Sequence, residues 1–233
     1  MAPGIQVAQI SASTWAISAR GLDGRFTNKL LVLMDGRSVY SPTFSGVYWD
    51  VQDTVIADIE RIEVIRGPGA ALWGANAVNG VINIITKAAA ATQGGLVSLR
   101  SGSEEQGGAV LRVGGTFGDL GHWRVYGKAF DRDATVTTAG NQAGDGWRQQ
   151  RVGFRTDLVP TGADAVTVQG DYYRGRAGEL SNLNYLTAPY NSTLRTAQDM
   201  DGGNLLVRWQ REVSSTDSFT VQGYIDHTQR DWP

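Results

Sequence analysis

The chain has 233 residues, a formal net charge of −2, 41% hydrophobic residues, thirty glycines and no cysteine. Its length fits one large domain or two small ones. The near-neutral charge gives no reason to expect nucleic acid as a partner, because phosphate binding requires clustered Lys and Arg. The lack of cysteine excludes disulfides and thiolate metal sites.

Neither a membrane-spanning helix nor a secretion signal is evident in the sequence. The longest apolar run, Leu30 to Met34, is far shorter than the about eighteen residues that a spanning helix needs. A membrane location would therefore require a β-barrel. The N-terminus, Met1 to Gln6, lacks a charged region followed by an apolar stretch, which for an exported protein predicts that the start is missing.

The first forty residues predict three strands. Alternation in residues 1–20 indicates one strand, a polar loop at Ser11 to Thr14, and a second strand. Lys29 to Met34 is almost wholly apolar, which is typical of a strand buried on both faces. Asp35-Gly36 then predicts a turn toward Arg37 to Tyr40.

Ser41 to Thr54 is irregular and aromatic, and two interpretations of its rings stay open. Phe44, Tyr48 and Trp49 could form an exposed binding loop, or they could fill the core of the domain. The nearby acids could be an acid pair or a metal cluster, but no histidine accompanies them and a solvated turn is favoured. These acids are Asp50, Asp53 and Asp58.

Asp58 to Lys87 predicts a strand, a short helix and a second strand. Alternating residues from Ile59 to Arg66 suit a strand with one buried face. Gly67-Pro68-Gly69 ends that strand and suits the first turn of a helix, and Asn79-Gly80 allows a tight return into Val81 to Thr86. The glycine spacing does not match a dinucleotide fingerprint or a P-loop, so a nucleotide site is not predicted.

Five segments of residues 1–87 occur together and in a fixed order. They are Arg20-Gly21, Leu30 to Tyr40, Ile59 to Pro68, Leu72-Trp73-Gly74 and Asn79 to Lys87. Together they resemble the plug domain of a TonB-dependent outer-membrane receptor. Two positions depart from that family's pattern, since Ala70 stands where a serine is usual and Trp73 where a tyrosine is usual. Both departures keep the size or the aromatic ring.

After the small-residue linker of residues 88–93, the pattern takes a period of two. We predict seven strands, at residues 94–101, 107–117, 121–132, 146–158, 164–175, 202–213 and 217–228. Most are near the nine to eleven residues that a tilted strand needs to cross a bilayer. Short and long connections alternate, as in outer-membrane barrels, with long loops at Asp133 to Asp145 and Arg176 to Asp201.

Aromatic residues near the predicted strand ends indicate interfacial girdles. They are Trp123, Trp147, Tyr172, Trp209 and Phe219. A soluble β-sandwich would show the same alternation, and the resemblance upstream decides for the membrane. The predicted fold class is an α+β plug domain (1–87), a linker (88–93) and an antiparallel transmembrane β-barrel segment (94–233). Because such transporters have about twenty-two strands, we expect the barrel to be incomplete and the chain a fragment.

The resemblance implies an outer-membrane receptor for energy-coupled uptake of a scarce ligand, most often a ferric siderophore. Other members of the family carry cobalamin, haem or a carbohydrate. The implied partners are a TonB-type periplasmic energy-transducing protein, whose contact peptide we do not find in this sequence, the ligand, and outer-membrane lipid. No cofactor is expected, and any metal would arrive within the transported chelate.

The resemblance also implies residue roles. Arg20 and Arg66 match plug arginines that pair with barrel carboxylates and keep the plug seated. External plug loops would lie at about Gln9 to Thr14 and Tyr40 to Trp49. The ligand-binding candidates are Gln9, Ser11, Ser13, Tyr40, Phe44, Tyr48, Trp49, Tyr185 and Tyr190.

We predict that the protein is not an enzyme. The two histidines, His122 and His227, lie on different predicted strands, and no serine sits in a Gly-x-Ser-x-Gly elbow. Two alternatives to an uptake receptor remain: a passive outer-membrane porin or adhesin, and a soluble sugar-binding or hydrolytic β-protein using Asp50 with Asp53 or Asp58. A passive pore has no need of a folded domain ahead of its barrel.

Overall fold

The computed structural model describes residues 4–19, 29–41, 43, 46–74 and 76–231, apart from the side chains of residues 181 and 182. The chain divides into two compact units, Met1–Lys87 and Ala88–Pro233. In the described residues, no helix is both long and apolar enough to cross a membrane.

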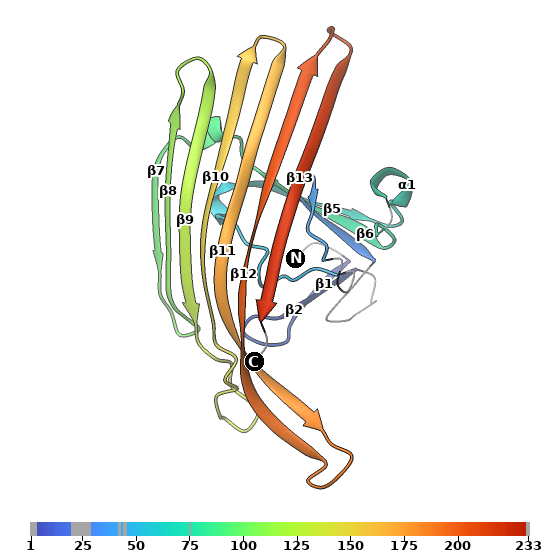
Figure 1. The fold of residues 1–233 in the computed structure, drawn as a ribbon, viewed down its shortest axis with the longest axis vertical. Coiled ribbons are helices and arrows are strands. Elements are labelled where there is room, and N and C mark those ends of the chain that lie inside the picture. The colour runs from blue at the N-terminus through green and yellow to red at the C-terminus, as the bar shows by residue number, and fades with distance from the viewer. Residues whose placement is uncertain (1–3, 20–28, 42, 44–45, 75, 232–233) are drawn as a thin grey trace. The chain divides into compact units, whose positions relative to one another are not determined.

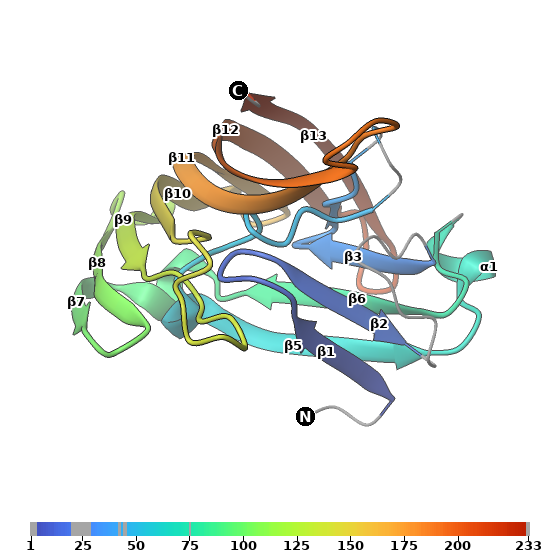
Figure 2. The same cartoon turned by 90° about the horizontal axis from the view of Figure 1, so that it is seen from below.

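The first unit is built on a four-stranded mixed sheet (Figure 2). Its strands run in the order β4 (Arg37–Ser38), β3 (Leu30–Met34), β6 (Gly80–Thr86) and β5 (Ile59–Arg66). β3 pairs with β6 in parallel, and β5 pairs with β6 antiparallel. A separate hairpin joins β1 (Ile5–Gln9) to β2 (Trp15–Ala19).

β3 explains why its sequence is apolar at every position. Leu30, Val32 and Met34 join one hydrophobic cluster, whereas Leu31 and Leu33 join another with Ala77 and Val81. All five strand residues are buried. Each fully buried side chain of this size stabilises the unit by about 1.5–3 kcal/mol. The prediction of a strand buried on both faces is confirmed.

The predicted strand, short helix and strand of residues 58–87 is also confirmed. A 3-10 helix, η1 (Ile56–Asp58), precedes β5, and α1 (Ala70–Trp73) stands between β5 and β6. Gly80 opens β6 at a φ of 157°, and a Cβ there would lie 2.5 Å from the carbonyl oxygen of Ile65. Only glycine allows this close return of the chain.

The second unit begins with a 3-10 helix, η2 (Ala89–Thr92), followed by one curved sheet of seven antiparallel strands (Figure 1). In sheet order these are β7 (Gly94–Arg100), β8 (Glu105–Thr116), β9 (Gly121–Arg132), β10 (Trp147–Thr161), β11 (Asp164–Asn184), β12 (Asn191–Glu212) and β13 (Ser218–Asp231). Every strand pairs with its neighbours in sequence. The described strands form one layer, so the two-layer sandwich is excluded.

The register of the sheet separates its side chains into two faces. Lys128, Arg151 and Tyr173 are cross-strand partners on one face, which we call the polar face. Gly127, Val152 and Tyr172, one residue earlier or later, are partners on the other, which we call the apolar face. This is the alternation expected of a membrane-spanning barrel wall.

One predicted loop is wrong. Residues 176–201 were expected to form a long loop, but β11 and β12 continue through them as a paired hairpin closed by residues 185–190. The hairpin extends beyond the other strands at the end where the β9–β10 connection also lies (Figure 1). The sequence of this extension does not indicate a strand, because its largely polar side chains show no apolar period of two.

Candidate functional site

The aromatic segment of the first unit is partly core. Tyr40 and Trp49 pack against the cluster around Val32. The Tyr40 hydroxyl donates to the carbonyl oxygen of Leu30 at 3.2 Å, and burial raises the pKa of Tyr40 to about 12. Tyr48 is half-buried, and Phe44 lies outside the described residues. For Tyr40 and Trp49, the structure therefore supports a packing role, which leaves their part in ligand contact a prediction.

The loop between β1 and β2 is a tight turn. The Ser11 hydroxyl accepts from the amide of Thr14 at 3.1 Å, and the amide of Ile10 donates to the carbonyl oxygen of Thr14 at 2.8 Å. Ser13 is buried, with 5% of its surface exposed, whereas Gln9 is exposed. Of the candidates on this loop, Gln9 is therefore the most accessible to a solute.

Of the two predicted plug arginines, only Arg66 lies in the described residues. Arg66 is exposed at the end of β5, and its side chain passes over Gly4, where a Cβ would lie 3.3 Å from its Cδ. Arg20 lies outside the described residues. Pairing of either arginine with a barrel carboxylate remains a prediction.

The acids do not form a metal cluster in the described residues. Asp53 accepts from the amide of Thr54 at 2.9 Å, while Asp58 is buried in η1 with its carbonyl oxygen bound by the amide of Lys87 at 2.8 Å. Among the described residues, no group of three His, Asp or Glu could hold a metal ion. Asp53 therefore makes the local contact that is expected of an acid in a solvated turn.

A carboxylate that sequence reasoning missed holds the first unit together. Asp35 is buried at the turn after β3, and its two oxygens accept from the amide and the hydroxyl of Thr86, each at 2.8 Å. The contact joins the turn after β3 to the last residue of β6. A second carboxylate, Glu63, accepts from Arg61 at 2.8 Å and from Asn83 at 3.0 Å, and the hydrogen bond from Arg61 lowers its pKa. Arg61 and Glu63 form an exposed pair, which contributes little stability.

The polar face of the second unit carries a connected network. Arg151 forms an ion pair with Asp171, which also accepts from the Asn204 amide at 2.9 Å. The Arg151 guanidinium carbon lies 4.8 Å from the centre of the Tyr173 ring. This network aligns β10, β11 and β12 and provides charged groups along the polar face.

A second carboxylate on this face seats η2. Asp157 accepts from the amide of Ala89 at 2.6 Å, from the Thr167 hydroxyl at 2.8 Å and from Arg155 Nε at 2.9 Å. Thr92 is buried at the end of η2. Asp157 thus links the start of this unit to its wall, together with Arg124 of β9, which donates to the Thr92 hydroxyl at 3.4 Å.

The apolar face is exposed along its length. The large side chains of this face that have at least 37% of their surface exposed are Val97, Leu99, Leu111, Val113, Val125, Val152, Phe154, Tyr172, Leu205, Val207, Trp209, Phe219, Val221 and Ile225. A continuous apolar surface of this kind requires a nonpolar neighbour, which for a barrel wall is lipid.

The girdle prediction is wrong for one ring. Trp209 and Phe219 lie edge to face on the apolar face, with ring centres 5.8 Å apart. Trp147, in contrast, is on the polar face, buried, with its ring centre 4.5 Å from that of Phe130. Its position beside the polar network cannot be read from its place at a strand end.

The two tyrosine candidates of the second unit lie together at the tip of a hairpin, whereas the two histidines lie on opposite faces of the sheet. Tyr185 and Tyr190 flank the exposed tip of the β11–β12 hairpin, where the Tyr185 amide donates to the carbonyl oxygen of Tyr190 at 2.8 Å. By register His122 is on the polar face and His227 on the apolar face, so the two imidazoles cannot form a catalytic pair.

Comparison with known proteins agrees with this architecture. The TonB-dependent Receptor Plug Domain matches residues 1–81. The chain is 35% identical over 182 residues to the ferric enterobactin receptor of Pseudomonas aeruginosa, covering 70% of this chain and 24% of that protein. It is 36% identical over 129 residues to the vitamin B12 transporter BtuB of Vibrio vulnificus, covering 49% and 20%.

Among solved structures, the unliganded ferric citrate transporter FecA matches with a TM-score of 0.72 at 20% identity, covering 98% of this chain and 36% of that one. The chain spans less than a quarter of the length of the ferric enterobactin receptor and of the vitamin B12 transporter that it matches. A plug fold followed by consecutive antiparallel strands with one apolar and one polar face is the arrangement found in these proteins, which reside in the Gram-negative outer membrane. The chain belongs to the TonB-dependent receptor family, as a plug domain followed by strands of the barrel wall.

Proposed function

We propose that this receptor imports a ferric siderophore across the outer membrane, with energy from a TonB-type periplasmic protein. The observation that carries the proposal is the succession of a folded plug domain and a barrel wall. A lumen wide enough for a large solute would leak unless a domain filled it, and a passive porin or adhesin has no need of such a domain.

The cargo is proposed from similarity and from chemistry. The relative from P. aeruginosa is named a ferric enterobactin receptor. Tyr48, Tyr185 and Tyr190 offer flat rings with polar tips, which suit an aromatic or amide-rich chelate. The iron would be cargo within the chelate, without a protein-bound metal or cofactor, and we propose no catalytic step.

Growth and transport of a deletion strain test the proposal. Under iron limitation, a strain without the receptor should fail to grow on one ferric siderophore from a panel that also contains haem and cobalamin. Restoring the receptor should restore growth, and uptake of radiolabelled iron should stop when the periplasmic energy-transducing protein is deleted. Uptake that persists without that protein would contradict energy coupling and favour a passive pore.

Cobalamin is the second candidate, because the chain is 36% identical to a vitamin B12 transporter over its matching part. A deletion strain that depends on external cobalamin and grows normally on every siderophore would assign this cargo instead. The mechanism of uptake would be the same.

A further inference from the structure

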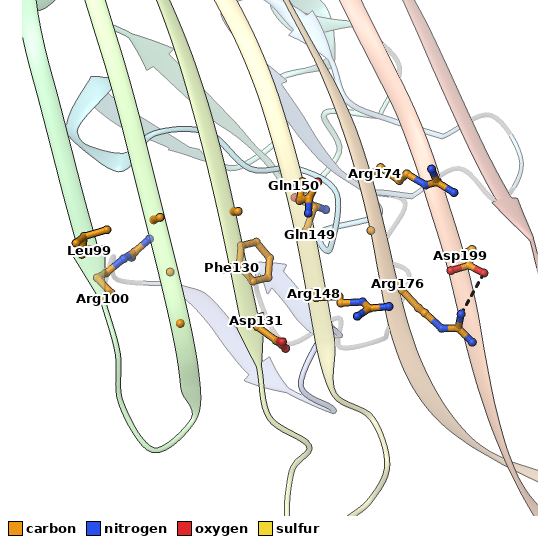
Figure 3. A pocket seen from close by; sticks show the side chains of 15 residues that line it. Leu99, Arg100, Phe130, Asp131, Arg148, Gln149, Gln150, Arg174, Arg176 and Asp199 are labelled. Atoms are coloured by element: carbon orange, nitrogen blue, oxygen red, sulfur yellow. Dashed lines mark ion pairs between the residues drawn. The ribbon is translucent and has the colours of Figure 1, made fainter.

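The extension of the β11–β12 hairpin lies beyond the apolar band of the wall. On the outer side of β12, Trp209 at the short-turn end and Asp199 are ten residues apart. At about 3.3 Å per residue this is roughly 33 Å along the strand, and a tilt of about 40° reduces it to roughly 25 Å, the height of the apolar band of an outer-membrane barrel. Asp199 pairs with Arg176 at 3.7 Å, at a level where charged side chains replace apolar ones (Figure 3). Residues 178–197 therefore lie outside the membrane.

The two sides of the extension continue the two faces of the wall. The pairing of β11 with β12 runs to Asn184 and Asn191 without a shift of register. Asn184, Asn191, Thr193 and Arg195 lie on the side that continues the apolar face, which we call the outer side, and all four are exposed. The outer side thus becomes mostly polar once it leaves the lipid, where its neighbour is water.

The inner side, which continues the polar face, changes in the opposite direction. Leu183 and Leu194 lie on it with 40% and 48% of their surface exposed, and they are diagonal neighbours across the two strands, within reach of each other. The Ser192 hydroxyl, on the same side, donates to the Tyr185 hydroxyl at 3.2 Å, so the Tyr185 ring is held along this side as well. We call Leu183, Tyr185 and Leu194 the tip patch.

The tip patch has no charged group beside it in the sequence. No Asp, Glu, Lys, Arg or His occurs from Leu180 to Leu194. Arg195 is on the outer side and donates to the carbonyl oxygen of Gln142 at 3.1 Å. A carboxylate chelate would be recognised by guanidinium or ammonium groups, which the patch lacks. Clustered leucine and tyrosine side chains outside the membrane instead favour a partner with apolar and aromatic surface.

We propose that the tip patch binds the aromatic rings of a ferric tris-catecholate. The inference rests on the proposed import of a ferric siderophore and narrows the cargo to a chelate with an aromatic exterior. The inner side continues the face of the wall that encloses the lumen, so a chelate held there is next to the route that import requires. Leu183 and Leu194 bury the ring faces, and the Tyr185 ring packs against a catechol ring, a contact that contributes beyond the buried area.

Equilibrium binding to the full-length receptor in detergent, measured by quenching of tryptophan fluorescence, tests the inference. The probes are a ferric tris-catecholate and ferric citrate, in which carboxylates without rings hold the iron. Leu183→Ser and Leu194→Ser should each weaken binding of the tris-catecholate roughly tenfold, as expected for the loss of a partly buried leucine contact. In cells, these variants should raise the half-saturating concentration for iron uptake and leave the maximal rate unchanged, because the patch acts in binding.

Leu180→Ser is the matched control. Leu180 is on the same hairpin and 39% exposed, close to Leu183, but it lies on the outer side, so its loss should leave binding unchanged. Unchanged tris-catecholate binding in the Leu183→Ser/Leu194→Ser double variant, or equal weakening by Leu180→Ser, would overturn the inference. The mobility of unheated samples on gels verifies that each variant is folded.

The wild-type receptor separates failure of this inference from failure of the proposed function. Binding and import of ferric citrate without binding of the tris-catecholate would overturn the aromatic assignment and leave import of a ferric chelate standing. If the wild type bound and imported no ferric chelate at all, the proposed function would fail, and the inference with it.

Discussion

Replacing Asp157 with alanine should release η2 from the barrel wall. The side chain accepts from the Ala89 amide at 2.6 Å, from the Thr167 hydroxyl at 2.8 Å and from Arg155 Nε at 2.9 Å. Only the first of these bonds holds η2, whereas the other two join side chains of β10 and β11. Asp157→Ala should therefore affect local opening of η2 and the stability of the sheet to different degrees.

The size of the local effect follows from one hydrogen bond to a charged acceptor, which contributes about 2 kcal/mol where water replaces it poorly. This change corresponds to roughly a thirtyfold rise in the opening equilibrium. Hydrogen–deuterium exchange of a peptide covering residues 88–93, measured on the receptor in detergent, should accelerate by that factor. The two other lost bonds should lower the midpoint of chemical unfolding as well.

Asp164→Ala is the control for this experiment. Asp164 also accepts two hydrogen bonds, from the Thr161 hydroxyl at 2.6 Å and Trp209 Nε1 at 3.0 Å, but these partners lie on β10 and β12. Exchange in residues 88–93 should be unchanged in that variant. If Asp157→Ala left exchange there at the wild-type rate, the view that this carboxylate seats η2 would be refuted.

Three further predictions concern single residues. In unfolding experiments, Gly114→Ala should destabilise the packing of η2 against the wall by about 1–3 kcal/mol, because its Cβ would lie 2.4 Å from the carbonyl oxygen of Thr92. The control Gly127→Ala has open space at the Cβ and should cost less than about 1 kcal/mol. Thr86→Val should destabilise the first unit by about 1–3 kcal/mol, because it removes the hydroxyl that donates to one buried oxygen of Asp35. The measurement is protease cleavage within residues 1–87, which should become faster, and cleavage at the wild-type rate would contradict this. Burial raises the pKa of Tyr40 from 10.0 to about 12, so between these pH values the folded unit keeps a proton that the unfolded chain loses. The stability of the unit should therefore fall as pH rises from about 10 to 12, and Tyr40→Phe should show a smaller fall in the same unfolding assay.

Much of the fold could be predicted from the sequence because its signals are local. The apolar run of β3 indicates burial on both faces, and the glycines around α1 indicate the tight return between β5 and β6. The period of two from residue 94 onward predicts seven strands, and the structure has seven in the described residues. These features depend only on neighbouring residues and on which face each side chain occupies.

The contacts that fix the sites could not be predicted, because they join residues far apart in the chain. Asp35 and Thr86 are 51 residues apart, and Ala89 and Asp157 are 68 apart. Nothing in the local sequence distinguishes Asp35 from an acid in a solvated turn, or Asp157 from any polar residue near the end of a strand. The extension of β11 and β12 was missed for a different reason, since a polar hairpin beyond the lipid needs no apolar face.

The two long-range carboxylates lie on either side of the junction between the units, and their positions limit how the first unit can move. Asp35 holds Thr86, the last residue of β6, and Asp157 holds Ala89. Between them Lys87 is also fixed to its own unit, by its amide and by its ammonium, which donates to the carbonyl oxygen of Ala57 at 2.8 Å. Ala88 is thus the one residue between two fixed points.

A tether of this length permits little translation, because each residue spans at most about 3.6 Å. Displacement of the first unit by more than a few ångströms must therefore break either the contacts of Thr86 and Lys87 or the hydrogen bond of Ala89. The first set belongs to a buried strand and consists of several bonds, whereas η2, a 3-10 helix of four residues, is held to the wall by the bond from Ala89 to Asp157 and by a longer one, at 3.4 Å, from Arg124 to the Thr92 hydroxyl. If uptake requires the plug to move, release of η2 is consequently the step of lowest cost, and Asp157→Ala should make that step easier without unfolding the plug.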